Sequence, residues 1–317
     1  MNKTLNILVT GCGGDIGQSV GKILIKSNFI GKLYGIDISN RNAGQFVYSN
    51  FSIGLPVTHP NYLYSLELFI SKHDIDLIIP VSEPELRFFS EQNILVRVGS
   101  AKMIIASGLS LRIGFDKFAT AEFLKNKNLP FPKTLLANRS MKIDKWPVIL
   151  KSRVGSGSKE IHRINSMEEF IFYTKNGSSN YVVQELIDDK NGEYTCGLYR
   201  SGKGEVRTII LQRELTGGYS GYGEVIENNA ITALLDTLAD ELQLIGSINV
   251  QLRISGNLPK IFEINPRFSS TVLFRHLFGF KDLEWSVKDL FGEKLEPYIQ
   301  PSVGSKFYKG FSEYIKC

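Results

Sequence analysis

The chain has 317 residues, of which 43% are hydrophobic and 22% charged, so a disordered, collagen-like or fibrous protein is excluded. Its 37 basic and 32 acidic residues leave a net charge of +5 that is scattered along the chain, and this pattern predicts neither a nucleic-acid nor a membrane partner. Roughly 150 residues per domain predicts two domains. With three cysteines at unpaired spacing, no secretion signal and no membrane-spanning apolar run, we expect a reduced, cytoplasmic protein without a zinc site.

The first hundred residues alternate short β-rich runs with amphipathic stretches. We expect strands at residues 6–10, 33–37, 76–81 and 101–106, and helices at residues 18–27 and 63–72. Strands that alternate with helices predict parallel β-α units.

A glycine-rich segment follows the first expected strand. Residues 10–17 read TGCGGDIG, and Asp37 ends the second strand where a ribose-binding acid would lie. Taken alone, this spacing indicates a nicotinamide dinucleotide site, because backbone amides at a helix start can approach a phosphate. The alternative is that the glycines only allow tight packing of strand and helix. A reductase would also need a Tyr and a Lys four residues apart on a helix, and the pair Tyr199 and Lys203 lies in an expected hairpin turn.

The second half reads as helices and antiparallel hairpins. We expect helices at residues 115–126 and 230–242 and three hairpins, which pair residues 148–152 with 160–164, 194–199 with 206–212, and 246–254 with 260–264. Residues 217–223 are rich in Gly and Tyr. They predict a loop that closes over an acceptor or, equally, a flexible surface connection.

Two lysines and one strand end indicate nucleotide binding. Lys117 begins a helix, and Lys151 ends a strand just before a loop of alternating glycine and serine. Such a loop can place backbone amides over phosphates, while the ammonium groups supply positive charge. Each feature alone is more often an exposed lysine beside a flexible turn. The strand at residues 181–187 could present its backbone to an adenine, with Glu193 near the ribose.

The last hairpin carries the strongest pattern. If its turn is centred on Asn257, then Gln251 and Glu263 are cross-strand partners, and Asn265 shares their face. On the opposite face, four apolar side chains would pack in the core: Val250, Leu252, Phe262 and Ile264. Three oxygen-bearing side chains with one carboxylate suit Mg²⁺, which prefers hard oxygen ligands. The alternative is an ordinary polar face on a structural hairpin.

Residues 246–251 (GSINVQ) and 262–271 (FEINPRFSST) resemble the metal-binding hairpin of ATP-grasp enzymes, with the nearest likeness to the synthetase halves of the carbamoyl-phosphate synthase large subunit. The resemblance implies an α/β fold whose second half is α+β: a Rossmann-like preceding domain at residues 1–108, then an ATP-grasp domain at residues 109–317. A mobile lid would span about residues 133–184. In this family the preceding domain helps form the acceptor site, which favours packing as the role of the N-terminal glycines.

The resemblance also implies site residues and cofactors. ATP would be held by Lys117, Lys151, Gly155, Ser156, Gly157, Ser158, Glu185, Leu186, Ile187 and Glu193. Two Mg²⁺ ions, or Mn²⁺, would be bound by Gln251, Glu263 and Asn265. Arg213 and Arg267 would hold the carboxylate and the acyl phosphate. Two departures from the family pattern are Lys159-Glu160, where a glycine is usual, and Gln251 in place of an acid.

The implied activity joins a small-molecule carboxylate, activated as an acyl phosphate, to an amine, and a homodimer is common among relatives. A synthetase that phosphorylates carbamate or bicarbonate is an alternative. A non-catalytic nucleotide-binding protein is a second alternative from another class, and a reductase that uses the glycine segment is the least favoured.

Overall fold

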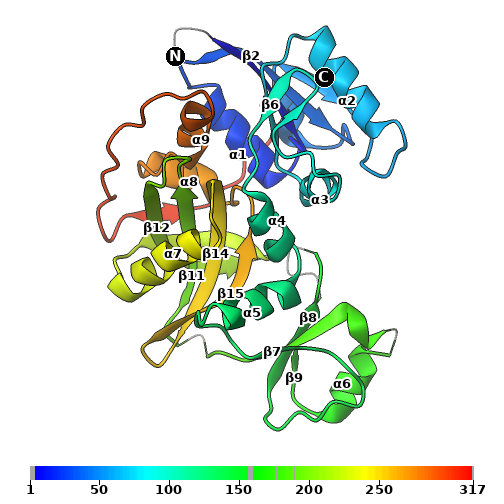
Figure 1. Ribbon diagram of the computed structural model, residues 1–317, viewed down its shortest axis with the longest axis vertical. Coiled ribbons are helices and arrows are strands. Elements are labelled where there is room, and N and C mark those ends of the chain that lie inside the picture. The colour runs from blue at the N-terminus through cyan, green and yellow to red at the C-terminus, as the bar shows by residue number, and fades with distance from the viewer. Residues whose placement is uncertain (1–3, 156–159, 176, 189, 316–317) are drawn as a thin grey trace.

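The N-terminal part of the chain forms a mostly parallel six-stranded sheet in a computed structural model that describes residues 4–155, 160–175, 177–188 and 190–315 (Figure 1). In sheet order the strands are β3 (Asn50–Ile53), β2 (Ile30–Asp37), β1 (Leu5–Thr10), β4 (Leu77–Pro80), β6 (Ala101–Met103) and β5 (Arg97–Val98). Strand β5 runs antiparallel to its neighbour, and the other pairs are parallel. The central strands β1 and β4 are apolar and buried, as expected for a parallel sheet covered on both faces. The predicted α/β class is therefore confirmed.

Helices cover both faces of this sheet. α1 (Asp15–Leu24) packs on one face, and α2 (Tyr62–Lys72) and α3 (Glu83–Glu91) pack on the other. A short 3₁₀ turn, η1 (Ala43–Phe46), precedes β3. The spacing of apolar residues predicted α1 and α2. It did not predict α3, which buries few side chains.

The N-terminal glycines are explained by close packing. A Cβ on Gly17 would lie 2.6 Å from the Cys12 Cα atom, and one on Gly21 would lie 2.7 Å from the ring of Tyr48. The Asp37 carboxylate accepts a 2.8 Å hydrogen bond from the Gly13 amide, so it anchors the glycine loop itself. These contacts support the packing interpretation of the TGCGGDIG segment.

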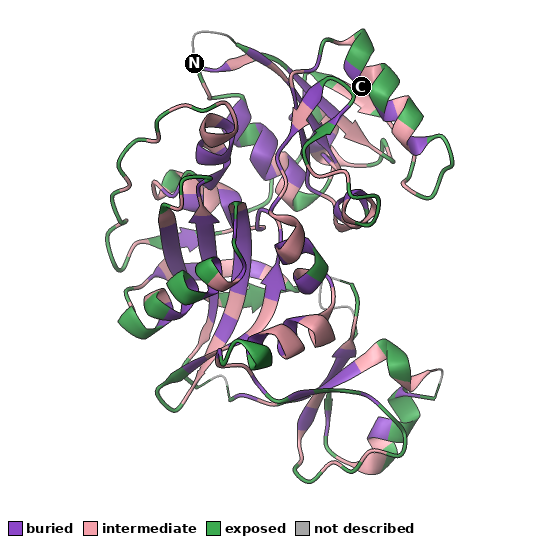
Figure 2. Ribbon diagram, in the orientation of Figure 1, coloured by how far each residue is buried: buried purple, intermediate pink, exposed green. Residues whose placement is uncertain are grey.

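The second large sheet has six antiparallel strands and forms the centre of the molecule. In sheet order they are β15 (Leu258–Asn265), β14 (Gly246–Ser255), β11 (Glu193–Arg200), β12 (Val206–Thr216), β13 (Tyr219–Val225) and β16 (Lys306–Tyr308). α7 (Asn229–Glu241) covers one face, and α8 (Val272–Leu277) and α9 (Asp282–Leu290) lie on the other. α8 and α9 also join the core of the N-terminal sheet, so the two halves share buried side chains (Figure 2).

The expected loop at residues 217–223 is instead mostly strand, which corrects that prediction. β12 continues to Thr216, and β13 begins at Tyr219, so only Gly217 and Gly218 form the turn. Both have positive φ (58° and 87°), the geometry that a tight two-residue hairpin turn needs. Gly221 and Gly223 lie within β13, where a side chain would clash with its neighbours: a Cβ on Gly223 would lie 2.4 Å from the Phe307 ring.

A small third sheet stands apart from the rest, at the lower right in Figure 1. Its order is β7 (Thr134–Leu136), β10 (Tyr181–Glu185), β8 (Val148–Ser152) and β9 (Ile161–Ile164), all antiparallel. α6 (Met167–Tyr173) and η2 (Ser178–Asn180) complete it, and α4 (Gly108–Gly114) and α5 (Lys117–Asn126) lead into it. The sheet has its own apolar core. No helix in the described ranges is long and apolar enough to cross a membrane.

Candidate active site

The hairpin of β14 and β15 places the expected polar side chains on one face. Gln251 pairs with Glu263, as predicted, and Asn249 pairs with Asn265. The opposite face is the apolar core beneath α7, where Val250 is fully buried. The amide and acid side chains of this face are therefore held by a strand pair whose other face packs in the core.

The prediction that Phe262 packs in the core is wrong. Leu252 pairs with Ile261, whereas the preceding residue Gln251 pairs with Glu263, so the strand has a bulge at Phe262. Ile261 takes the core position with 1% exposure, and Phe262 lines the cleft instead. The predicted pairing of Gln251 with Glu263 is preserved because the turn is one residue shorter than expected and the bulge adds one residue to β15.

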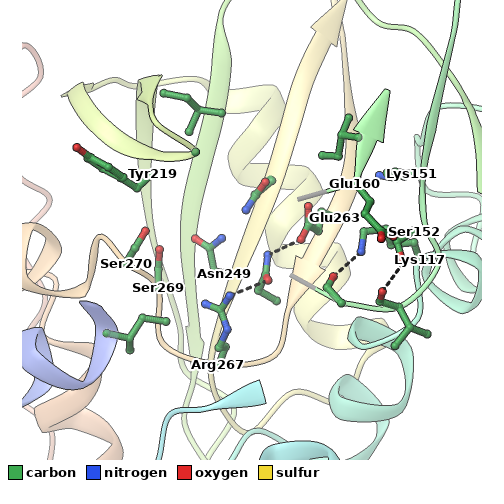
Figure 3. A pocket seen from close by; sticks show the side chains of 18 of the residues that line it. Lys117, Lys151, Ser152, Glu160, Tyr219, Asn249, Glu263, Arg267, Ser269 and Ser270 are labelled. Atoms are coloured by element: carbon green, nitrogen blue, oxygen red, sulfur yellow. Dashed lines mark hydrogen bonds between the residues drawn. The ribbon is translucent and has the colours of Figure 1, made fainter. Parts of the chain in front are cut away.

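Two adjoining cavities of about 420 Å³ and about 300 Å³ lie along this hairpin. Six residues line both: Lys151, Ile161, Arg213, Leu215, Gln251 and Glu263. The larger cavity also includes Lys117, Gly155, Asn265 and Arg267, and the smaller includes Glu185, Leu186, Ile187 and Glu193. The structure thus gathers every predicted site residue that it describes along these two cavities. Figure 3 shows the larger one. Ser156, Gly157 and Ser158 lie outside the described residues.

The three predicted metal ligands offer one carboxylate and two amides. Glu263 Oε1 accepts a 3.3 Å hydrogen bond from Asn265 Nδ2, and Asn265 Oδ1 accepts one of 3.1 Å from Arg267. Gln251 Oε1 accepts a 3.0 Å bond from Arg213. Within the described ranges, no cluster of three or more His, Cys, Asp and Glu side chains could hold a metal. The oxygens of this face nevertheless fit Mg²⁺, which takes only one or two carboxylates when substrate phosphates complete its shell.

Two lysines bring positive charge to the same cavity. Lys151 is 3% exposed, and its ammonium donates a 3.2 Å hydrogen bond to the Phe262 carbonyl. Burial lowers the pKa of Lys151 to about 8, although the nearby Glu263 carboxylate opposes this shift. Lys117 donates a 2.7 Å hydrogen bond to the carbonyl of Gly155, the first residue of the predicted phosphate loop. The two lysines therefore bring positive charge to the same cavity from different elements.

The loop's starting strand is tied to the helix that carries Lys117. Asp116 caps α5 by accepting hydrogen bonds from Phe118 and Ala119, and it also receives two from the Arg153 guanidinium, at 2.8 and 2.6 Å. Burial opposes ionisation, but the Arg153 hydrogen bonds outweigh it and lower the pKa of Asp116. Gly155 has φ +111°, a backbone conformation that favours glycine. A Cβ there would meet no described atom within 4 Å, so the constraint comes from the backbone and not from a steric clash.

The smaller cavity has apolar walls and one anchored acid at its edge. Ile149, Ile161, Leu186 and Phe262 line it. Glu185 accepts 2.9 and 3.1 Å hydrogen bonds from Lys260, which counter burial and lower the pKa of this carboxyl group. A cavity with apolar walls and the end of a strand at its edge suits an aromatic base.

Glu193 lines the smaller cavity and accepts hydrogen bonds from two arginines. Its Oε1 atom accepts bonds of 2.6 and 3.1 Å from Arg213, and its Oε2 atom accepts bonds of 2.8 and 3.1 Å from Arg253. Burial raises the pKa of Glu193, but the two guanidinium groups outweigh burial and hold it below its ordinary value. Glu193 therefore stays ionised and positions Arg213 against Gln251.

The sequence reasoning missed several residues of the larger cavity. Asn249 could have been found, because it lies two residues before Gln251 and so shares its face. Ser269 and Ser270 lie within the stretch that carried the family resemblance but were given no role. Ile16 comes from α1 of the N-terminal sheet, and no local pattern indicates that it reaches this cavity.

Comparison with protein families identifies the second half of the chain. Residues 115–271 match the ATP-grasp domain. A carbamoyl phosphate synthase large chain of Caldanaerobacter subterraneus subsp. tengcongensis is 23% identical over 216 residues, which are 62% of this chain and 20% of that protein. An uncharacterized protein of Mycoplasma genitalium is 31% identical over 83 residues, which are 26% of this chain and 28% of that protein. The matches thus span about a fifth to just over a quarter of these relatives.

Solved structures share the fold over nearly the whole chain. N5-carboxyaminoimidazole synthetase from Staphylococcus aureus, complexed with ADP, has a TM-score of 0.75 and 17% identity, and the match covers 94% of this chain and 80% of that one. A biotin carboxylase complex with β-γ-ATP from Campylobacter jejuni has a TM-score of 0.72 and 14% identity, with 96% and 74% covered. At such identity the likeness establishes the fold, a Rossmann-like domain followed by an ATP-grasp domain.

Proposed function

From the premise that residues 115–271 form an ATP-grasp domain, we propose that this protein is an ATP- and Mg²⁺-dependent ligase. It activates a small-molecule carboxylate as an acyl phosphate and joins it to an amine. One observation carries the proposal: two cavities that share six lining residues bring together two lysines, three arginines and the amide and acid side chains of the β14–β15 hairpin. Anionic phosphates and a divalent cation are the ligands that such a charge pattern matches.

The nucleotide occupies both cavities in this proposal. The adenine lies in the smaller one, with its edge against the backbone of residues 185–187. Glu193 accepts hydrogen bonds from the ribose in exchange for bonds that it now accepts from Arg213 and Arg253. The triphosphate extends into the larger cavity, where Lys117 and Lys151 neutralise it. Gly155, which lines the larger cavity, lies beside the phosphates in this proposal.

Gln251, Glu263 and Asn265 would hold the metal, which would supply charge neutralisation at the phosphate oxygens. The Asn265 oxygen, which now accepts a hydrogen bond from Arg267, would be one of its ligands. Glu263 is the single carboxylate of this trio, so it supplies the charge, while the two amides fix the geometry.

The reaction needs no protein nucleophile, because phosphoryl transfer depends on positioning and charge neutralisation. A carboxylate oxygen of the substrate attacks the γ-phosphorus, and the bond to the β-γ bridging oxygen breaks as ADP leaves. The amine nitrogen then attacks the acyl carbon, the bond to phosphate breaks, and the amine gives up its proton. Arg213 and Arg267 hold the anionic carboxylate and acyl phosphate.

Phosphorylation of carbamate or bicarbonate is a second candidate, favoured by the match to carbamoyl phosphate synthase large chains. A nucleotide-binding protein without catalysis is the rival from another class. The retention of both lysines and all three metal ligands in one cleft favours an enzyme. A reductase is disfavoured because the Asp37 carboxylate is committed to the Gly13 and Ser39 amides.

The experiment measures phosphate release from ATP and Mg²⁺ across a panel of amino acids and carboxylated sugars, each with a set of amines, and detects amide products by mass. Bicarbonate and carbamate form a separate arm. Thermal unfolding is followed in parallel: at about 100 times Kd, ATP with Mg²⁺ should stabilise the protein by roughly 2.7 kcal/mol.

Stabilisation by ATP without turnover in any arm would favour the non-catalytic protein. Stabilisation by NADP and not by ATP would overturn the proposal entirely.

A further inference from the structure

A separate cavity of about 510 Å³ lies in the N-terminal half of the chain, at the carboxyl edge of its sheet. Its walls are the ends of β1 and β2, the segment after β3, the start of α3 and one side of α2. None of its lining residues lines the two cavities of the candidate active site. Ligands of open α/β sheets bind outside the carboxyl ends of the strands, so this is a position where a ligand is expected.

The walls of this cavity are largely apolar and carry negative charge. The polar side chains that line it have hydroxyl groups, apart from two acids, Asp37 and Glu85. Among the described residues, no Lys, Arg or His lines it. The apolar side chains that line it are Ile36, Ile38, Ile53, Leu55, Val57, Leu66 and Phe69. The cavity therefore suits an apolar or aromatic molecule, and its charge disfavours an anion.

Glu85 is a buried carboxyl group whose hydrogen-bond partners are neutral. Its Oε1 atom accepts a 2.7 Å hydrogen bond from Tyr62, and its Oε2 atom accepts one of 2.5 Å from Ser82. Burial raises the pKa of Glu85, and the nearby Asp37 charge raises it further, although the hydroxyl donors oppose the shift. Asp37 also accepts only from neutral groups, the amides of Gly13 and Ser39. In the described ranges neither acid forms an ion pair, and a buried charge without one is unfavourable.

The Thr10 hydroxyl is an unused polar group on the same wall. Thr10 is 1% exposed, and within the described residues its Oγ1 atom has no hydrogen-bond partner, although it is close enough to Glu85 to lower the pKa of that carboxyl group. Thr10 shares its strand face with Leu8, which packs in the core beneath α2, so its side chain points to the side where the cavity lies. A buried hydroxyl without a partner is costly, and a ligand in this cavity can supply the partner.

The glycine segment beside the cavity is not arranged to bind a phosphate. The amides of residues 12–14 all donate within the protein, to two backbone carbonyls and to the Asp37 carboxylate. A nucleotide phosphate at this edge of the sheet depends on such amides at the start of the helix. The cavity thus occupies the usual ligand position of its fold but offers acceptors and negative charge where a dinucleotide needs donors.

We propose that this cavity binds an organic cation, a small molecule with an apolar or aromatic body and an ammonium group. An ammonium group has three donors and no acceptor, so it can donate to the Glu85 carboxylate and to the Thr10 hydroxyl together. The body of the molecule lies against the apolar side chains of β2 and α2. Because this site shares no lining residue with the candidate active site, the inference is independent of the proposed ligase function.

The test measures binding of three probes that share one ring and differ in charge: phenethylamine, phenethyl alcohol and phenylacetate. Each is titrated by calorimetry at neutral pH, where the amine is protonated, and the amine is titrated again with saturating ADP and Mg²⁺. Glu85→Gln removes the buried charge. Glu91→Gln is the matched control, because it removes the same charge from the exposed end of the same helix. Ser65→Phe fills the cavity from α2 and tests its location without altering an acid.

We expect wild type and Glu91→Gln to bind the amine at least about tenfold more tightly than the alcohol, a difference of about 1.4 kcal/mol, and not to bind phenylacetate. Glu85→Gln should lose this preference, and Ser65→Phe should abolish binding of amine and alcohol. ADP with Mg²⁺ should leave the affinity for the amine within about twofold.

Four results would overturn the inference: no binding of the amine to the wild type, equal affinity for amine and alcohol, a preference for the amine that survives Glu85→Gln, or displacement of the amine by ADP. Failure of ADP to bind at all, with the expected amine binding, would count against the ligase proposal alone.

Discussion

Replacement of Lys151 by Met should make the protein more stable while abolishing nucleotide binding. Met has a similar length and no charge, so it fills the same space beside Phe262 without a buried ammonium group. Burial lowers the pKa of Lys151 from 10.5 to about 8, and this difference corresponds to about 3 kcal/mol against the charged form in the folded protein. The lost hydrogen bond to the Phe262 carbonyl offsets about 1 kcal/mol of the gain.

The effect should depend on pH in a defined direction. Below pH 8 the ammonium is charged in both the folded and the unfolded chain, so the full penalty applies to the wild type. Between pH 8 and 10.5 the unfolded chain binds more protons at this position, and the wild type gains stability as pH rises. We therefore expect Lys151→Met to raise the free energy of unfolding by about 2 kcal/mol near pH 7 and by almost nothing near about pH 9.5.

The assay is urea unfolding of wild type and variant at both pH values, with ATP binding measured by calorimetry. Lys117→Met is the matched control: it also removes a cationic group from the cavity, but Lys117 is only half-buried, so this variant should weaken ATP binding without making the protein more stable. If Lys151→Met destabilises the protein equally at both pH values, burial does not disfavour the charged form of Lys151, and the reasoning is wrong.

Three further outcomes follow from the same geometry. Glu263→Gln should reduce turnover by at least about 10²-fold, partly recovered by raised Mg²⁺, whereas Glu122→Gln on the exposed side of α5 should change neither activity nor melting temperature; equal small effects at both would remove the metal-site argument. Binding of ATP should raise the pKa of Lys151, so calorimetry in buffers of different ionisation enthalpy near pH 8 should detect uptake of about half a proton, and zero or net release would contradict the assigned contact. Gly155→Val places a branched residue at φ +111° and should weaken ATP binding, while Gly256→Val, also at positive φ but in the hairpin turn, should cost stability without a change in ATP affinity; equal ATP affinity in both would make the loop a plain turn.

Local patterns in the sequence determined many of the helices and strands and the polar face of the site, although not α3 or the strand structure at residues 217–223. Alternation of apolar and polar residues places Gln251 and Glu263 together, because side chains of a strand alternate between faces and a short turn sets the pairing. The same reasoning locates Lys151 at a strand end beside a glycine loop. These features depend on residues that are close in the chain, within one hairpin, so they can be predicted from a single sequence.

The tertiary structure decided which chemistry each polar group offers. Ile261 packs in the core under α7, and the resulting bulge places Phe262 in the cleft. The pKa of Lys151 is lowered because this residue of the third sheet is buried next to β15. The orientation of the Asn249 side-chain amide is imposed by Arg275, which is 26 residues away in the chain and lies on α8, packed on the same face of the sheet as Asn249. Burial and long-range hydrogen bonds of this kind depend on how separate elements pack, and no local periodicity records that packing.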